Sequence, residues 1–186
     1  MVINHSKEKL INLIVYFVTN TKNCGKTKLF KLLYFVDFTC FKMTGKTVTG
    51  LSYFAWDKGP VPVELFKEME SPDKDFAKNF SITKIDSSDR LNIKPKNGAK
   101  FDDSHFTKLE IQIIKDITFI YKDALAKDIV EVTHLKNSPW DKTLKAKGKY
   151  KKIDFLLAFD SDVASLSMDE YKQRMDEEDE IDRLLS

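Results

Sequence analysis

The sequence has few cysteines, glycines and prolines, and it has no long apolar run. Two cysteines, Cys24 and Cys40, and three histidines occur at spacings typical of neither a disulfide framework nor a metal site. Six glycines and five prolines are too few for a low-complexity chain. No apolar stretch approaches the ~18 residues of a membrane span, and the N-terminus lacks a signal peptide's features. We therefore expect a soluble, cytoplasmic protein without metal, cofactor or membrane contact.

The chain also lacks a strong excess of either charge. Its 31 basic and 29 acidic residues give a formal net charge of +2, so charge does not favour nucleic acid as a partner. With 42% hydrophobic residues in 186, the chain can bury one sizeable core. We expect a single domain over residues 1–186, mainly α (α+β), as a helical bundle with a small β-hairpin or short sheet.

Two helices open the chain. Leu10, Leu13, Ile14 and Phe17 recur at helical spacing and predict a first helix over about residues 6–21. A second helix is predicted over about 26–43, where eleven of the fifteen residues from Leu29 to Met43 are apolar or aromatic. A helix that is apolar on nearly all sides is buried, so this one should form the core.

The later segments are predicted from turn residues and periodicity. We expect, in order, a short strand at Tyr53–Trp56 broken by Gly59-Pro60; a short helix from Pro62 to Glu70; a hairpin of Phe80–Asp86 with Leu91–Pro95; a long helix from Ser104 through Ala124; a helix through Val130 and Leu135 that stops near Pro139; a lysine-rich connection after Trp140; a strand or buried turn at Ile153–Asp160; and an acidic helix over 168–185.

The tripeptide Gly25-Lys26-Thr27 resembles the end of a phosphate-binding loop. Such a loop also needs a glycine five residues earlier and a preceding strand. Asn20 occupies that position, and the preceding segment is predicted as helix. We therefore interpret Gly25 as a turn glycine, with Thr27 or the loop before it capping the second helix, and expect no nucleotide site.

One acidic residue, Asp37, interrupts the apolar second helix. On a helical wheel Lys28, Lys31, Thr39 and Lys42 fall within roughly 80° and form its only polar face, from which Asp37 is excluded. A carboxylate in apolar surroundings needs hydrogen bonds or a cation, because uncompensated burial is costly. Asp37 should therefore have a specific partner, with either a structural or a functional role.

Two other features carry possible chemistry. His134 precedes Ser138-Pro139-Trp140, but no serine or cysteine nucleophile is recognisably placed with it, which favours a structural histidine. Residues 142–152 hold six lysines and no acid. This segment is either a solvated loop, also complementary to the acidic C-terminus, or a phosphate-contacting surface of a nucleic-acid-binding regulator. No catalytic residue is predicted.

Several short motifs occur in a recognisable order. The sequence TKLFKLLYFVDF is followed by Thr44-Gly45, by Thr49-Gly50 with an aromatic run, by Gly59-Pro60-Val61-Pro62, and finally by VTHLKNSPW. This order resembles the signature of the Panacea domain, the SocA-like antitoxin family. The resemblance marks these residues as structural or interface candidates: Lys28, Lys31, Tyr34, Asp37, Gly45, Thr49, Gly50, Tyr53, Trp56, Gly59, Pro60, Pro62, His134, Pro139 and Trp140.

The resemblance implies a mainly helical fold and a function as the antitoxin of a bacterial or prophage toxin-antitoxin pair. Its partner would be a cognate toxin, neutralised by direct binding, and an AAA+ protease is a further partner if the protein acts as an adaptor. Neither role requires catalytic residues. The sequence leaves open which toxin is bound, by which surface and in which oligomeric state.

Overall fold

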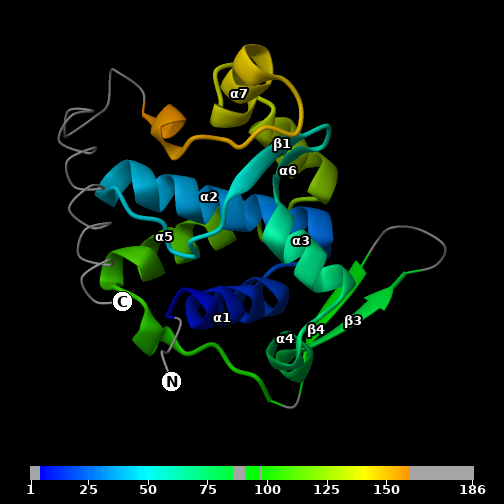
Figure 1. Ribbon diagram of the computed structural model, residues 1–186. Coiled ribbons are helices and arrows are strands. Elements are labelled where there is room, and N and C mark those ends of the chain that lie inside the picture. The colour runs from blue at the N-terminus through cyan, green and yellow to red at the C-terminus, as the bar shows by residue number, and fades with distance from the viewer. Residues whose placement is uncertain (1–4, 86–90, 97, 160–186) are drawn as a thin grey trace, which may run out of the picture.

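The computed structural model describes residues 5–85, 91–96 and 98–159. Within them the chain is mainly helical with two small antiparallel hairpins, which confirms the predicted fold class (Figure 1). The elements are α1 (His5–Asn20), α2 (Lys26–Thr44), β1 (Tyr53–Trp56), β2 (Gly59–Pro62), α3 (Val63–Glu70), α4 (Lys74–Asn79), β3 (Phe80–Lys84), β4 (Leu91–Pro95), η1 (Asp103–His105), α5 (Lys108–Tyr121), α6 (Ala126–Thr133), α7 (Pro139–Lys147) and η2 (Phe155–Ala158). The predicted acidic helix 168–185 lies outside the described residues.

Helix α2 runs through the middle of the molecule, as Figure 1 shows, and packs against α1, α5, α6, β2, β4 and η2. Its apolar residues are buried on nearly all sides, as the composition predicts. The helix ends at Gly45, which adopts a left-handed conformation with φ 79° while its N–H donates to the carbonyl of Phe41. Glycine is the usual residue at this position, so the Thr44-Gly45 motif is a helix stop.

Of the two predicted caps of α2, Thr27 is wrong, and the N-cap residue lies in the preceding loop. Gly25 itself is the N-cap residue, in an extended conformation, and no side chain caps the helix. A Cβ atom on Gly25 would lie 3.0 Å from the carbonyl oxygen of Leu91. Gly25 therefore brings the start of α2 close to β4, and Thr27 lies inside the helix.

The Gly59–Pro62 segment is a strand and does not simply break the preceding one. β2 pairs antiparallel with β1, with Tyr53 opposite Pro62 and Trp56 opposite Gly59. Prolines are tolerated here because β2 is an edge strand. The other edge of β1 is bonded to residues 150–153, since Tyr150 N donates to Ala55 O and Ile153 N donates to Tyr53 O.

Helix α5 begins later than predicted. Thr107 caps it, accepting a hydrogen bond from Glu110 N while the Glu110 carboxylate accepts one from Thr107 N. This capping box outcompetes Ser104, which lies in the separate turn η1. The helix ends at Tyr121, so Ala124 belongs to the connection that leads into α6.

The segment after Trp140 is a helix where a connection was predicted. Ser138 caps α7 by accepting from Asp141 N, and Pro139 occupies its first turn, where a missing N–H costs nothing. The predicted strand or buried turn at 153–160 contains the short 3-10 helix η2. The sequence contains the signal for this helix start, a serine followed by proline, but the prediction used the proline only as the end of the preceding helix.

Candidate functional site

The Asp37 carboxylate is completely buried and accepts four hydrogen bonds. Oδ1 accepts from the backbone N–H groups of Val48 and Thr49 at 2.8 and 2.9 Å. Oδ2 accepts from the hydroxyls of Thr49 and Tyr53, the latter at 2.7 Å. Burial raises the pKa of Asp37, and these hydrogen bonds oppose the shift. The predicted partner of Asp37 is therefore a set of neutral donors from Val48, Thr49 and Tyr53. We call Asp37 together with these three residues the carboxylate cluster.

The carboxylate cluster fixes the loop that follows α2. The Thr49 hydroxyl also accepts a hydrogen bond from Leu51 N at 3.2 Å. Between them Gly50 has φ +70°, a conformation that side-chain-bearing residues rarely adopt. The Thr49-Gly50 motif is thus a turn tied to the centre of the core helix through Asp37.

Two lysines of the predicted polar face of α2 are buried. Lys28 and Lys31 are 0% and 1% exposed. The Lys28 ammonium donates to the carbonyls of Lys22, Lys122 and Ala124 at 2.8–3.0 Å, and burial lowers its pKa. A helical wheel gives only the side of the helix on which a residue lies. It does not show that the long side chain of a lysine can extend along the helix to carbonyl groups near the helix end. Lys28 thereby joins the start of α2 to the α5–α6 connection.

Lys31 lies against the Gly59-Pro60 strand. Its ammonium donates to the carbonyl of Pro60 at 2.7 Å, and burial lowers its pKa to about 7. Gly59 has φ +90°, and a Cβ atom there would lie 2.7 Å from Thr133 Oγ1 and 2.9 Å from Lys31 Nζ. The motif needs glycine at this position because the lysine and the threonine occupy the space of a side chain.

The third motif, around His134, lies beside Lys31 and the Gly59-Pro60 strand. The His134 ring stacks on Trp140 with centroids 3.9 Å apart, and Trp140 Nε1 donates to Trp56 O at 2.9 Å. Burial and the charge of Lys31 lower the pKa of His134. We call Lys31, Gly59, Pro60, Thr133, His134 and Trp140 the ammonium cluster. The histidine is packed against Trp140 beside Lys31, and its structural role stays a prediction.

Two buried polar atoms in this region, Tyr34 Oη and His134 Nε2, have no hydrogen-bond partner within 3.5 Å among the described residues. Burial raises the pKa of Tyr34, and the nearby backbone of Trp140 partly opposes this shift. Tyr34 packs on Phe38 with centroids 4.2 Å apart and meets Tyr53 edge-on at 5.5 Å. Its ring therefore lies next to Tyr53 of the carboxylate cluster.

The structure brings most of the predicted residues together in these two clusters along α2. Gly45 and Pro62 are buried at the end of α2 and of β2, while Trp56 and Pro139 are half-buried and Gly50 is exposed. The signature residues are thus mostly inaccessible to a partner protein.

The lysine-rich segment is partly neutralised by this chain's own acids. Lys145 pairs with Asp141 at 2.6 Å, and Lys149 pairs with Asp57 at 2.5 Å. Lys142, at 3.5 Å, donates to the carbonyl of Leu157. Fewer cations of this segment are available to phosphates than its composition indicates.

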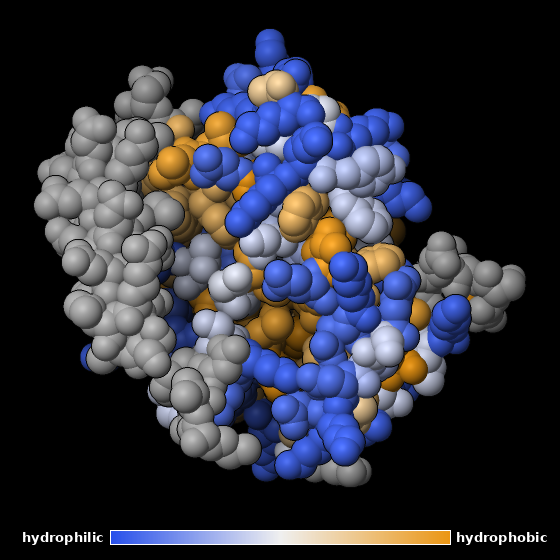
Figure 2. Space-filling model, viewed as in Figure 1, coloured by the Kyte–Doolittle hydropathy of each residue, from blue (hydrophilic) through white to orange (hydrophobic). Residues whose placement is uncertain are grey.

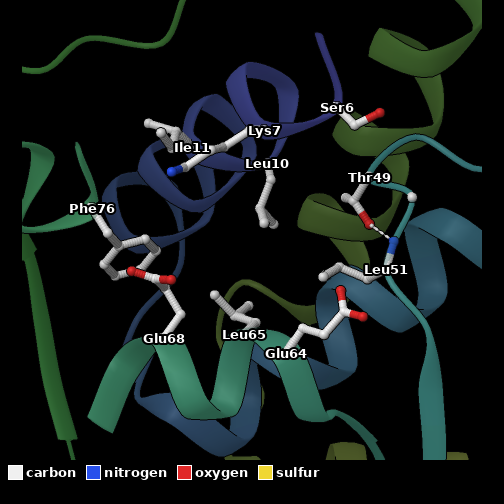
Figure 3. Close-up of a pocket in the computed structure, with 11 residues that line it drawn as sticks. Ser6, Lys7, Leu10, Ile11, Thr49, Leu51, Glu64, Leu65, Glu68 and Phe76 are labelled. Carbon is white, nitrogen blue, oxygen red and sulfur yellow. Dashed lines mark hydrogen bonds between the residues drawn. The ribbon is translucent and has the colours of Figure 1, made fainter. Parts of the chain in front are cut away.

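A surface groove of about 440 Å³ lies between α1, α3, α4 and the Thr49-Gly50 turn. Its floor is apolar and consists of Leu10, Ile11, Leu51, Leu65 and Phe76. Figure 2 shows a hollow with an orange floor and hydrophilic surroundings between α1 and α3. In Figure 3 the leucine side chains of α1, α3 and the turn point into this space.

The rim of the groove carries the charged residues Lys7, Glu64 and Glu68, together with Ser6 and Gly50. We call the floor and this rim the acidic groove. Sequence reasoning missed it because its residues come from separate segments. The only local signal is the acid-Leu-x-x-acid pattern of α3, which is too common to indicate a site.

The described part of the chain contains neither a side-chain group that could hold a metal ion nor a helix that could cross a membrane. Within residues 5–85, 91–96 and 98–159, no group of three His, Cys, Asp or Glu side chains is arranged to hold a metal ion. None of the helices in those residues has the length and apolar character needed to cross a membrane.

Comparison with models of protein families matches residues 29–141, more than half of the chain, to the family described as Antitoxin SocA-like, Panacea domain. The matched region contains both clusters and every candidate signature residue except Lys28. No curated protein and no solved structure matches the chain.

Proposed function

Because this chain belongs to the SocA-like antitoxin family with a Panacea domain, we propose that it neutralises a toxin protein by binding it directly. The match over residues 29–141 is the observation that carries the proposal. The toxin is expected to be the product of an adjacent gene in a bacterial or prophage genome, and the complex is expected to form in the cytoplasm.

The geometry of the two clusters supports a binding role without catalysis. Asp37 has four hydrogen-bond donors of its own chain, and Lys31 is bonded to a backbone carbonyl. A general acid, base or nucleophile must reach its substrate, whereas these groups are buried and already engaged. The signature therefore maintains a scaffold, and the exposed surface around it is left to contact the toxin.

Co-expression with the adjacent gene product tests this proposal. We expect the toxin alone to stop growth of a bacterial host and the pair to restore it, with both proteins eluting together in size-exclusion chromatography. If growth is not restored and the purified proteins do not associate over a wide concentration range, the proposal is wrong.

Delivery of the toxin to an AAA+ protease is a finer version of the same function. In that case the toxin should disappear faster when this protein is present, and deletion of the host's AAA+ proteases should stabilise it. A toxin that is neutralised at unchanged half-life would indicate inhibition by binding alone.

The nucleic-acid alternative is weakened, since Lys145 and Lys149 of the lysine-rich segment pair with acids of the same chain. A direct check is binding to a duplex of the operon's own promoter at low salt. Affinity that falls steeply with added salt would revive this alternative.

A further inference from the structure

We propose that the acidic groove is the docking site for a segment of the toxin that carries a large apolar side chain next to arginine or lysine. This inference rests on the proposed function and deepens it by naming the surface and the chemistry of the segment that fills it. The groove is open at the surface, whereas the two clusters are mostly buried, and Thr49 of the carboxylate cluster lines the groove.

The floor of the acidic groove favours an apolar anchor. Leu65 and Phe76 are each 2% exposed and belong to the core, so the floor is firmly supported. Leu10 and Ile11 on α1 are only half-buried, and their apolar surface remains open to water. Covering such a surface is favourable in proportion to the apolar area removed from water. A side chain inserted from outside would bury it.

The rim selects for positive charge. Glu64 is exposed and forms no ion pair or hydrogen bond with any residue that the structure describes. The Glu68 carboxylate accepts from Asp73 N at 2.7 Å, and its second oxygen has no partner within the described part of the chain. Lys7, the cation of the rim, pairs with Asp73 and Asp75 at 2.7 and 3.5 Å. The rim is therefore acidic, and a guanidinium or ammonium group complements it.

The carboxylate cluster prepares one wall of the groove. Asp37 fixes Thr49, and the hydroxyl of Thr49 fixes Leu51, so the turn that contributes Gly50 is held before any partner arrives. A preformed wall reduces the conformational entropy that binding must overcome. This gives the buried aspartate an indirect part in recognition, as a positioning residue for the turn.

The open shape favours a polypeptide segment over a small molecule. The groove lies between two helices, α1 and α3, and its few polar groups are at the rim. An amphipathic segment laid between two helices meets such a surface with an apolar face and charged flanks. A small-molecule site would be more enclosed, with polar groups converging inside it.

Three variants test the proposal by titration of the purified adjacent gene product. Glu64→Lys should weaken binding about tenfold or more, and Glu64→Gln should weaken it less, because charge reversal adds repulsion to the lost attraction. Ser6→Trp places a large side chain on the exposed rim beside Gly50 and should also weaken binding by obstructing the groove. Circular dichroism and thermal melting must show that each variant folds.

Matched controls lie outside the acidic groove. Glu131→Lys makes the same charge change on an exposed position of α6, and Phe119→Ser removes the 81% exposed aromatic of α5. Both should bind as the wild type does. If the groove variants bind normally, or if Phe119→Ser alone abolishes binding, the groove is not the docking site although the antitoxin function stands. If the wild type binds nothing, both proposals are wrong.

Overlapping peptides of the toxin provide the second arm. We expect binding to peptides with an apolar residue beside arginine or lysine, competition with the full toxin, and loss of binding on Glu64→Lys. Peptides that bind the wild type and Glu64→Lys equally would contradict the proposed chemistry. Binding of a second copy of this chain, seen as a dimer that Ser6→Trp disrupts and the toxin does not, would also overturn it.

Discussion

Helix α2 carries two buried charges of opposite sign, and their surroundings differ. Asp37 receives four hydrogen bonds, two of them from backbone N–H groups. Lys31 donates one hydrogen bond within the described part of the chain, to Pro60 O, and its other neighbours are a glycine, a threonine and a histidine. A buried charge is tolerated when hydrogen bonds replace its hydration. By that criterion we expect Asp37 to be a structural anchor, whereas Lys31 can lose its charge near neutral pH.

The sharpest test of this contrast is Asp37→Ala. The substitution leaves four donors without their acceptor, and we expect the free energy of unfolding to fall by about 3–5 kcal/mol. Asp37→Asn keeps the size but turns an NH₂ group toward donors, so it should cost less than alanine yet still destabilise. Denaturant titration measures both, with Asp116→Ala on the exposed side of α5 as the control. A fully stable Asp37→Ala protein would show that the cluster is not an anchor.

Gly59→Ala probes the space around Lys31. An added Cβ would lie 2.7 Å from Thr133 Oγ1 and 2.9 Å from Lys31 Nζ, and φ is +90°. Crowding and backbone strain together should cost about 2–4 kcal/mol. Combining it with Thr133→Ala and Lys31→Met should recover part of the loss, because the first change removes Oγ1 and the second replaces the ammonium group with an adaptable apolar end. If Gly59→Ala alone melts like the wild type, the close approach is not a constraint.

The pH dependence of Lys31 gives a third test. Its pKa falls from 10.5 to about 7 on folding, so between these values the unfolded chain binds the extra proton. Stability should therefore rise with pH across that window, and below pH 7 both states are protonated. Relative to Lys31→Met, the wild type should gain roughly 3–4 kcal/mol between pH 7 and 10, since the slope across this window is about 1.4 kcal/mol per pH unit.

Taking the difference in the free energy of unfolding between the wild type and Lys31→Met at each pH removes the contributions of groups present in both proteins, such as Lys28 and the tyrosines. His134 stacks beside this position and is lowered in pKa by the same charge, so His134→Gln in both backgrounds isolates the lysine. Parallel pH curves for wild type and Lys31→Met would mean that the lysine keeps its charge when folded.

The smallest effect is expected at an exposed ion pair. Asp57 and Lys149 are 57% and 59% exposed in their side chains, and water and salt screen their attraction. Asp57→Asn should leave the melting temperature unchanged within experimental error at moderate salt. A clear loss of stability would show that the 150–153 segment depends on this pair for its pairing with β1.

The sequence predicted the elements whose signals are local. The extent of α2, the strand at Tyr53–Trp56 and the hairpin of β3 and β4 follow from apolar runs and turn residues. The need of Asp37 for a partner also followed, since a carboxylate in apolar surroundings requires one. Helix ends were less predictable: α5 starts after Thr107 rather than at Ser104, because two adjacent segments offered competing caps.

The family could be recognised from the order of residues in the sequence, whereas the contacts of those residues are seen only in the folded structure. Residue order alone was sufficient to recognise the family, because motifs such as Gly59-Pro60 and Thr49-Gly50 are short and contiguous. The wheel placed Lys28 and Lys31 on a polar face, and the fold buries both, because carbonyls of distant segments converge on their ammonium groups.

Local periodicity and turn chemistry were thus enough for the fold class, the core helix and the family. The donors around Asp37, the acceptors of the two lysines and the walls of the acidic groove depend on segments that meet only after folding. The residue pattern of a segment indicates whether that segment forms a helix or a strand. It does not indicate which backbone groups of distant segments will contact it in the folded protein.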